Sequence, residues 1–130
     1  MNREIKFKAF SKKENRMIWG YPVIEDGSIV SFIEEHTGSS YGYGYWDMHV
    51  LQFTGLRDKK GVDIYEGDCV IGRIIKLNDT NTFNGTVQWG TCYWCLEYRS
   101  PKGIVLKQRL ANFHEFEVIG NIHENPELLK

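Results

Sequence analysis

The chain has 130 residues, which is close to the usual size of a single domain. Its 16 Lys and Arg residues nearly balance 17 Asp and Glu residues, and the resulting formal net charge of -1 argues against a non-specific nucleic-acid binder that relies on surplus positive charge. A hydrophobic fraction of 42% and a charged fraction of 25% are ordinary for a globular protein and exclude a disordered or fibrous chain.

The composition favours β-structure. Ala, the best helix former, occurs only at Ala9 and Ala111, whereas branched and aromatic residues, which pack well on a pleated surface, are abundant. Three cysteines, an odd number, indicate reduced thiols rather than a disulfide framework. There is no signal-peptide pattern and no apolar run near the roughly 20 residues that cross a bilayer. We therefore expect a cytoplasmic protein outside the membrane.

The first third of the chain predicts a β-hairpin region. Residues 5–10 alternate between apolar and polar and predict a strand with one wet face. Residues 17–24 predict a second strand, in which Pro22 suggests an edge position or a bend. Asp26 and Gly27 form a strong hairpin-turn signal before a third strand over residues 28–33.

The rest of the chain predicts short strands separated by loops. Residues 34–47 contain repeated glycines and predict a loop that carries aromatic side chains. Residues 78–85 are polar and predict a second loop. Further strands are predicted over residues 49–54, 68–77, 86–89, 93–99, 104–107 and 116–122, with a short helical segment near 109–115 and a helix start at residues 125–127.

This pattern predicts a mainly β fold with very little helix. The expected architecture is a small, partly open, SH3-like β-barrel with an N-terminal β-hairpin region. We treat residues 1–130 as one domain. The aromatic loop is a candidate boundary between an N-terminal β subdomain, residues 1–47, and a barrel, residues 48–130.

Three stretches resemble one known family. They are Ile-Lys-Phe-Lys-Ala-Phe at residues 5–10, the run from Leu51 to Val70 that contains Thr-Gly-Leu-Arg-Asp-Lys-Lys-Gly and Ile-Tyr-Glu-Gly-Asp, and Phe-Glu-Val-Ile-Gly-Asn-Ile-His-Glu-Asn-Pro-Glu-Leu-Leu at residues 116–129. In this order the chain resembles the YopX family of phage and prophage proteins almost end to end. The resemblance implies a phage-encoded protein in the bacterial cytoplasm and self-association, and it supplies no catalytic residues.

The motif residues themselves are typical of turns. Asp58 and Gly61 bound a tight turn, and a Glu-Gly-Asp sequence such as residues 66–68 often leads into a strand of an SH3-like barrel. Gly67 would supply a positive φ, and Asp68 would bond nearby backbone amides. We assign architectural roles to Gly55, Asp58, Gly61, Glu66, Gly67, Asp68, Gly120, Asn125 and Pro126.

No motif indicates catalysis or a cofactor. Cys92 and Cys95 have the spacing of a redox pair or of half a zinc site, with Cys69 and either His114 or His123 as further ligands, but the pair lies in a strand-like run without regular ligand spacing. Buried thiols are the better interpretation. We find neither a nucleophile elbow nor a phosphate-binding loop, and we predict no cofactor, no metal ion and no enzymatic activity.

The candidate interaction surface combines aromatic and basic residues. In an extended segment the three tyrosines of the loop would share one side, where they would stack on bases or anchor a partner, although rings that cover a barrel end are the simpler alternative. The first 16 residues add a surplus of Lys and Arg. The candidate residues are Tyr41, Tyr43, Tyr45, Trp46, Lys6 and Lys8.

The leading functional prediction is a non-enzymatic interaction protein that forms a homo-oligomer and acts on an unknown host or phage protein. The alternative is an accessory nucleic-acid-binding protein that uses the basic N-terminal strand and the aromatic loop. An enzyme of unknown type is the third hypothesis.

Overall fold

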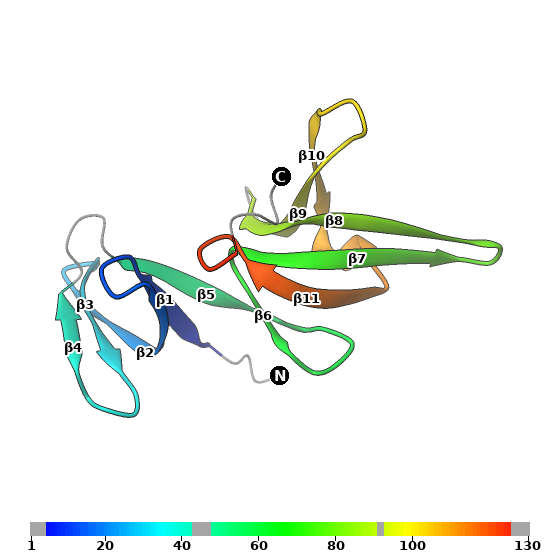
Figure 1. Ribbon diagram of the computed structural model, residues 1–130. Coiled ribbons are helices and arrows are strands. Elements are labelled where there is room, and N and C mark those ends of the chain that lie inside the picture. Colours follow the sequence, from blue (N-terminus) through cyan, green and yellow to red (C-terminus); the bar gives the residue numbers. More distant parts are fainter. Residues whose placement is uncertain (1–4, 43–47, 91–92, 126–130) are drawn as a thin grey trace. The chain divides into compact units, whose positions relative to one another are not determined.

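The computed structural model describes residues 5–42, 48–90 and 93–125. These residues form antiparallel β-strands and a single short 3-10 helix, so the prediction of a mainly β protein with very little helix is confirmed (Figure 1). The strands make two sheets, and neither closes into a barrel among the described residues, so the predicted barrel is an open one.

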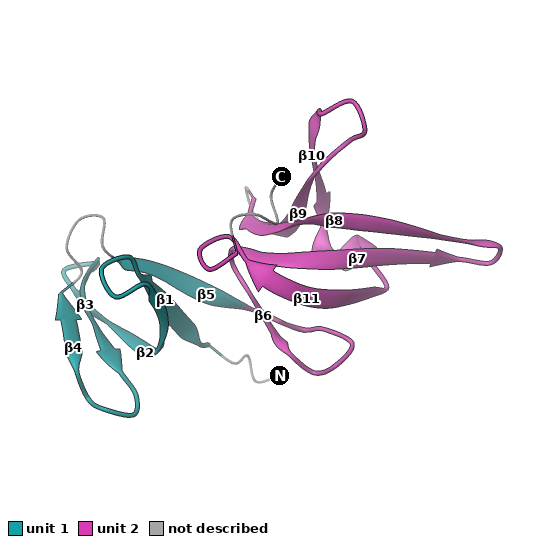
Figure 2. Ribbon diagram, in the orientation of Figure 1, with its two compact units in different colours: residues 1–53 teal, residues 54–130 magenta. Residues whose placement is uncertain are grey.

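The chain divides into two compact units, residues 1–53 and residues 54–130 (Figure 2). The division falls within β5, which begins in the first unit and ends in the second. The division into an N-terminal subdomain at residues 1–47 and a barrel at residues 48–130 stays a prediction.

Unit 1 contains five neighbouring strands, in the order β4-β3-β2-β1-β5, of a six-stranded sheet. The sixth strand, β6 (Asp63–Tyr65), is the neighbour of β5 and belongs to unit 2. Its core is formed by Ala9, Ile18, Phe32 and Met48, which are all buried. The strands are β1 (Phe7–Ser11), β2 (Arg16–Glu25), β3 (Ser28–Glu34), β4 (Ser40–Gly42) and the first part of β5 (Met48–Arg57).

Turn chemistry explains the β2–β3 hairpin of unit 1. Asp26 and Gly27 have φ angles of 50° and 78°, and positive φ at both central residues is the geometry that matches the twist of two antiparallel strands. Pro22 lies in β2 between β1 and β3, so the predicted edge position is wrong. The β2–β3 register shifts between Val23 and Ile24, where Val30 of β3 is the extra residue. The bend at Pro22 stays a prediction.

Unit 2 contains a sheet with the strand order β10-β9-β8-β7-β11. One face of this sheet packs on a core that includes Leu110 from the 3-10 helix, Phe113 from the segment that follows, and Phe116 from β11. The elements are β6 (Asp63–Tyr65), β7 (Asp68–Lys76), β8 (Asp79–Trp89), β9 (Trp94–Arg99), β10 (Val105–Arg109), η1 (Leu110–Asn112) and β11 (Glu115–Asn121).

Two segments predicted as loops contain strands. Residues 79–89 form β8, because the β7–β8 turn needs only Leu77 and Asn78, and the branched and aromatic residues that follow pair with β7. Ser40–Gly42 forms β4, which pairs with β3, whereas the rest of the predicted aromatic loop lies outside the described residues. The predicted helix start at residues 125–127 also lies mostly outside them.

Candidate interaction site

The sheet of unit 2 has two edge strands, β10 and β11, which differ in whether a turn covers their outer backbone groups. An edge strand presents a row of backbone N–H and C=O groups that have no partner in the sheet, and such a row is a template for another strand. Proteins that avoid this pairing cover the edge with a loop or place charges along it.

The β11 edge is covered by the turn that contains Asp58. The Asp58 Oδ2 atom accepts the Val118 N–H at 3.0 Å, and the Phe116 carbonyl accepts the Lys59 N–H at 3.0 Å. The Glu117 carboxylate lies 3.4 Å from Lys59 Nζ, which adds an ion pair to the same contact. The turn therefore occupies the backbone groups that β11 would offer to another chain.

The β10 edge carries no such cover among the described residues. It follows a hairpin turn closed by a hydrogen bond of 2.9 Å from the Ser100 N–H to the Ile104 carbonyl. In an antiparallel ladder, hydrogen-bonded pairs recur at every second residue, so Leu106 and Gln108 direct their backbone groups toward β9. The intervening residues of β10 direct theirs to the open side.

The open side of β10 therefore presents the backbone N–H and C=O groups of Val105, Lys107 and Arg109. The neighbouring apolar side chains are also accessible, since Ile104, Val105 and Leu106 are 58%, 47% and 40% exposed. We call Val105–Arg109 with this outward row the β10 edge. An accessible edge strand is a site where an extended segment of a partner can pair, and the basic side chains of β10 restrict the pairing to segments of compatible charge.

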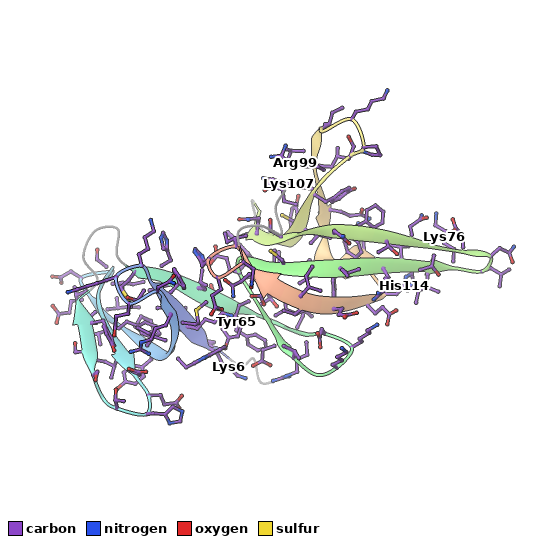
Figure 3. The ribbon with its side chains drawn as sticks, in the orientation of Figure 1. Lys6, Tyr65, Lys76, Arg99, Lys107 and His114 are labelled. Carbon is purple, nitrogen blue, oxygen red and sulfur yellow. The ribbon has the colours of Figure 1, made fainter. Side chains whose placement is uncertain are left out.

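The hairpin that carries the β10 edge is basic. Residues 98–114 contain four Lys or Arg residues and no Asp or Glu. Figure 3 places Arg99 and Lys107 along the β9–β10 hairpin. Because Lys107 and Arg109 alternate with uncharged residues, their side chains share one face of the sheet, and the Arg109 guanidinium lies 4.8 Å from the centre of the Tyr93 ring.

A groove of about 480 Å³ lies on the same face of the unit 2 sheet. The groove is lined by polar side chains that form two rows across the strands. In the first row, Asn84 lies beside Arg99, and Arg99 pairs with Val105. In the second row, Thr86 pairs with Glu97, and Glu97 pairs with Lys107. Both rows end at the β10 edge. A strand added to β10 would therefore place its side chains on this face at the end of those rows.

The predicted aromatic surface is only partly described. Tyr43, Tyr45 and Trp46 lie outside the described residues. Tyr41 lies in β4, where its hydroxyl donates to Glu34 Oε1 at 3.1 Å and accepts from Arg16 Nη2 at 2.6 Å. The hydrogen bond from Arg16 and its positive charge hold the pKa of the Glu34 carboxyl below its usual value. The Tyr41 ring also packs against the core of unit 1, so this tyrosine helps to hold the sheet together.

The basic residues of the N-terminal strand lie against aromatic rings. Lys6 Nζ is 4.9 Å from the centre of the Phe53 ring, and Lys8 Nζ is 5.0 Å from the centre of the Trp19 ring. Such contacts are cation–π interactions. Lys8 is also buried, which leaves it little area for a phosphate backbone.

Of the residues assigned to architecture, Gly61 and Gly67 lie in turns of unit 2, each with a φ angle of 83°. Gly55 instead lies within β5, which continues to Arg57, and has a φ angle of 89°. Asp68 Oδ2 accepts the Tyr65 N–H at 2.8 Å, and Glu66 belongs to the turn between them.

Near the end of the described chain, Gly120 lies in β11 beside the register shift of its pairing with β7. Asn125 Oδ1 accepts the Asn121 N–H at 3.3 Å, whereas Pro126 is not among the described residues.

The cysteines and histidines are dispersed. Cys69 and Cys95 are buried, burial raises the pKa of the Cys95 thiol, and Cys92 lies outside the described residues. His114 is used structurally, since its Nδ1 atom accepts the Ile75 N–H at 2.8 Å. Within residues 5–42, 48–90 and 93–125, no group of three or more His, Cys, Asp or Glu side chains is placed to hold a metal ion.

The β10 edge was not identified from the sequence, although a signal exists there. The run Arg-Ser-Pro-Lys-Gly-Ile-Val-Leu-Lys-Gln-Arg at residues 99–109 combines a turn, three consecutive apolar residues and only positive charges. What the sequence does not show is that this strand lies at the edge of the sheet, because strand order depends on long-range pairing.

Comparisons with known proteins give a consistent picture. The model of the YopX family, described as YopX protein, matches residues 6–130. The chain is similar to the crystal structure of protein EF1440 from Enterococcus faecalis, with 27% sequence identity and a TM-score of 0.70, over 99% of this chain and 100% of that one. No curated protein matches the chain. In the described part of the chain, none of the helical structure is long and apolar enough to cross a membrane.

Proposed function

Because this chain belongs to the YopX family, we propose that it is a non-enzymatic interaction protein of a phage or prophage, which acts in the bacterial cytoplasm on a protein of the host or of the phage. The observation that carries the proposal is the β10 edge, an accessible strand whose outward backbone groups have no partner among the described residues. A partner would bind by adding an extended segment to the sheet, with main-chain hydrogen bonds supplying the affinity.

Substituting Lys107 with proline tests this mode of binding. The Lys107 N–H faces the open side, so proline removes a donor to the partner and leaves the pairing with β9 intact. We expect Lys107→Pro to abolish capture of the partner from nuclease-treated lysate of phage-carrying cells, with a thermal unfolding midpoint within a few degrees of the parent's.

Two further variants separate the contribution of the Lys107 backbone N–H to partner binding from that of its side chain and from the pairing of β10 with β9. Lys107→Ala keeps the outward N–H and should retain part of the capture. Gln108→Pro removes an N–H that faces β9, and it should lower the unfolding midpoint. If Lys107→Pro captured the same partner as the parent, binding through the β10 edge would be wrong. A partner lost on nuclease treatment would favour the nucleic-acid alternative.

Self-association is the second part of the proposal, and unit 1 offers a surface for it. Trp19 and Tyr21 are 48% and 54% exposed and lie two residues apart on β2, so they share one face of the sheet. Exposed aromatic residues of this kind dominate the energetics of protein interfaces. The basic β10 edges of two copies would repel one another, so we assign self-association to this aromatic face.

Replacement of Tyr21 with glutamate should weaken self-association by about tenfold, because a charge replaces a ring at the centre of the contact. Light scattering over a dilution series measures the change. The Ile24→Glu variant is the matched control: Ile24 is also exposed, but it follows the register shift and lies away from the aromatic pair. Equal self-association by the parent and Tyr21→Glu would contradict the assignment.

A further inference from the structure

Side chains alternate between the two faces of β10, and this alternation determines which side chains of an added strand would be favourable on each face. The inference drawn from it rests on the proposed function of the β10 edge. On one face lie Lys107 and Arg109, beside the groove. On the other face lie Leu106 and Gln108, of which Leu106 pairs with Tyr98 of β9. An added strand alternates with the same period of two, so its residues face these two environments in turn.

The face that carries Lys107 and Arg109 is positively charged where the sheet ends at β10. On β9, Glu97 pairs with Lys107 and Arg99 pairs with Val105. One carboxylate thus stands among three cationic side chains, those of Arg99, Lys107 and Arg109. A strand that places acidic side chains on this face would gain favourable cross-strand pairs, whereas basic side chains there would be repelled.

The second face is apolar where the partner would lie. Leu106 is accessible, and so is Ile104 in the turn before it. Residues opposite Leu106 form a non-hydrogen-bonded pair, in which the side chains of the two strands approach closely. Branched apolar side chains of the added strand would cover Leu106 at this point.

The opposite edge of the same sheet already shows this arrangement. In β11, Glu115 and Glu117 alternate with the buried Phe116, and Glu115 pairs directly with Arg73 of β7. The Glu117 carboxylate lies 3.7 Å from Arg73 Nη2. Within this protein, a strand that alternates acidic and apolar residues thus lies beside a strand that carries a cationic side chain, Arg73. Because the Asp58 turn covers β11, that strand itself is not offered to a second copy.

We propose that the β10 edge binds an extended segment of a partner protein in which acidic residues alternate with branched apolar residues. The acidic side chains face Lys107 and Arg109, and the apolar side chains cover Leu106. The positive charge of the hairpin disfavours a second copy of this basic hairpin as the occupant, because like charges would then face one another across the added strand.

Fluorescence anisotropy with synthetic peptides tests the proposal on the full chain. The probe is a labelled peptide in which glutamate alternates with valine. One control peptide has the same composition with its glutamates and valines in separate blocks, and another has lysine in place of glutamate. We expect the alternating peptide to bind at least about tenfold more tightly than either control.

Protein variants locate the contact. Lys107→Glu should weaken binding of the alternating peptide by about fivefold. Lys102→Glu makes the same charge change in the hairpin turn, outside β10, and should have a smaller effect. The double variant Lys107→Glu with Arg109→Glu should prefer the lysine peptide, a reversal that loss of folding cannot produce.

Equal binding of the alternating and block peptides would overturn the proposed specificity, as would equal effects of Lys107→Glu and Lys102→Glu. The Lys107→Pro variant separates this failure from that of the proposed function. If Lys107→Pro loses its cellular partner while the parent binds the alternating and control peptides equally, the β10 edge binds the partner but the proposed alternation of acidic and apolar residues is wrong. If Lys107→Pro keeps both the partner and the peptide, the proposed function fails together with the inference.

Discussion

Substitution of Asp58 with alanine is expected to lower the free energy of unfolding by about 4 kcal/mol, because three backbone N–H groups would lose a charged acceptor. The Asp58 carboxylate accepts the N–H groups of Lys60, Val62 and Val118 at 2.8, 2.9 and 3.0 Å. The first two bonds close the turn, and the third attaches the turn to β11. Loss of the carboxylate would also expose the β11 edge to other strands.

The Asp58 carboxyl gives this effect a pH dependence. Burial alone would raise the pKa of Asp58, but the hydrogen bonds from Val118, Val62 and Lys60 outweigh it and hold the pKa below the usual value. A carboxyl with a lowered folded-state pKa contributes stability above its unfolded pKa, and this contribution is lost as the pH falls through the folded value. The difference in the free energy of unfolding between the parent and Asp58→Ala should therefore become smaller at acidic pH.

Urea denaturation at neutral and acidic pH measures both effects. Asp58→Asn keeps one acceptor oxygen and should lose less stability than Asp58→Ala at neutral pH. Asp79→Ala removes an exposed carboxylate at the start of β8 and should change the free energy of unfolding by no more than about 0.5 kcal/mol. A loss for Asp58→Ala as small as that for Asp79→Ala would show that the turn is not held through this side chain.

Local sequence signals identify the turns and most strands of this protein. Gly27 and Gly67 have the positive φ angles that their turn motifs predict, and the alternation over residues 5–10 matches β1. These features depend on a few neighbouring residues, so they can be read along the chain. The polar composition of residues 78–85 misleads for the same reason: a β-strand with one solvated face resembles a loop when branched residues are spaced by Asn and Gly.

Long-range pairing explains what the sequence does not reveal about the candidate site. The cationic and apolar residues of the hairpin are visible at residues 99–109, but their meaning depends on β10 being at an edge. The contrast with β11 requires the contact between Asp58 and Val118, which are 60 residues apart. An edge strand and a central strand of equal composition differ only in their neighbours, and neighbours are a property of the whole fold.

Gly85 gives the second large prediction, since its replacement by alanine should lower the free energy of unfolding by about 3 kcal/mol through overpacking. A Cβ atom at Gly85 would collide with the Glu97 carbonyl oxygen and lie 3.1 Å from Leu96 Cδ1. The obstacle is mainly backbone, so a change of rotamer does not relieve it. Gly85 pairs with Tyr98 of β9 and with Val70 of β7, near the centre of the unit 2 sheet.

The same substitution tests the register on which the β10 edge depends. β9 carries β10, so a shift of β9 away from Gly85→Ala would also disturb the faces of Lys107 and Leu106 and weaken peptide binding. Gly42→Ala is the matched control, because no atom of residues 5–42, 48–90 and 93–125 outside its chain neighbours lies within 4 Å of a Cβ at that position, and it should change the free energy of unfolding by about 0.5 kcal/mol or less. Urea denaturation compares the two. If Gly85→Ala were as stable as Gly42→Ala, β8 and β9 would pair in another register, and every alternation assigned to β10 would change with it.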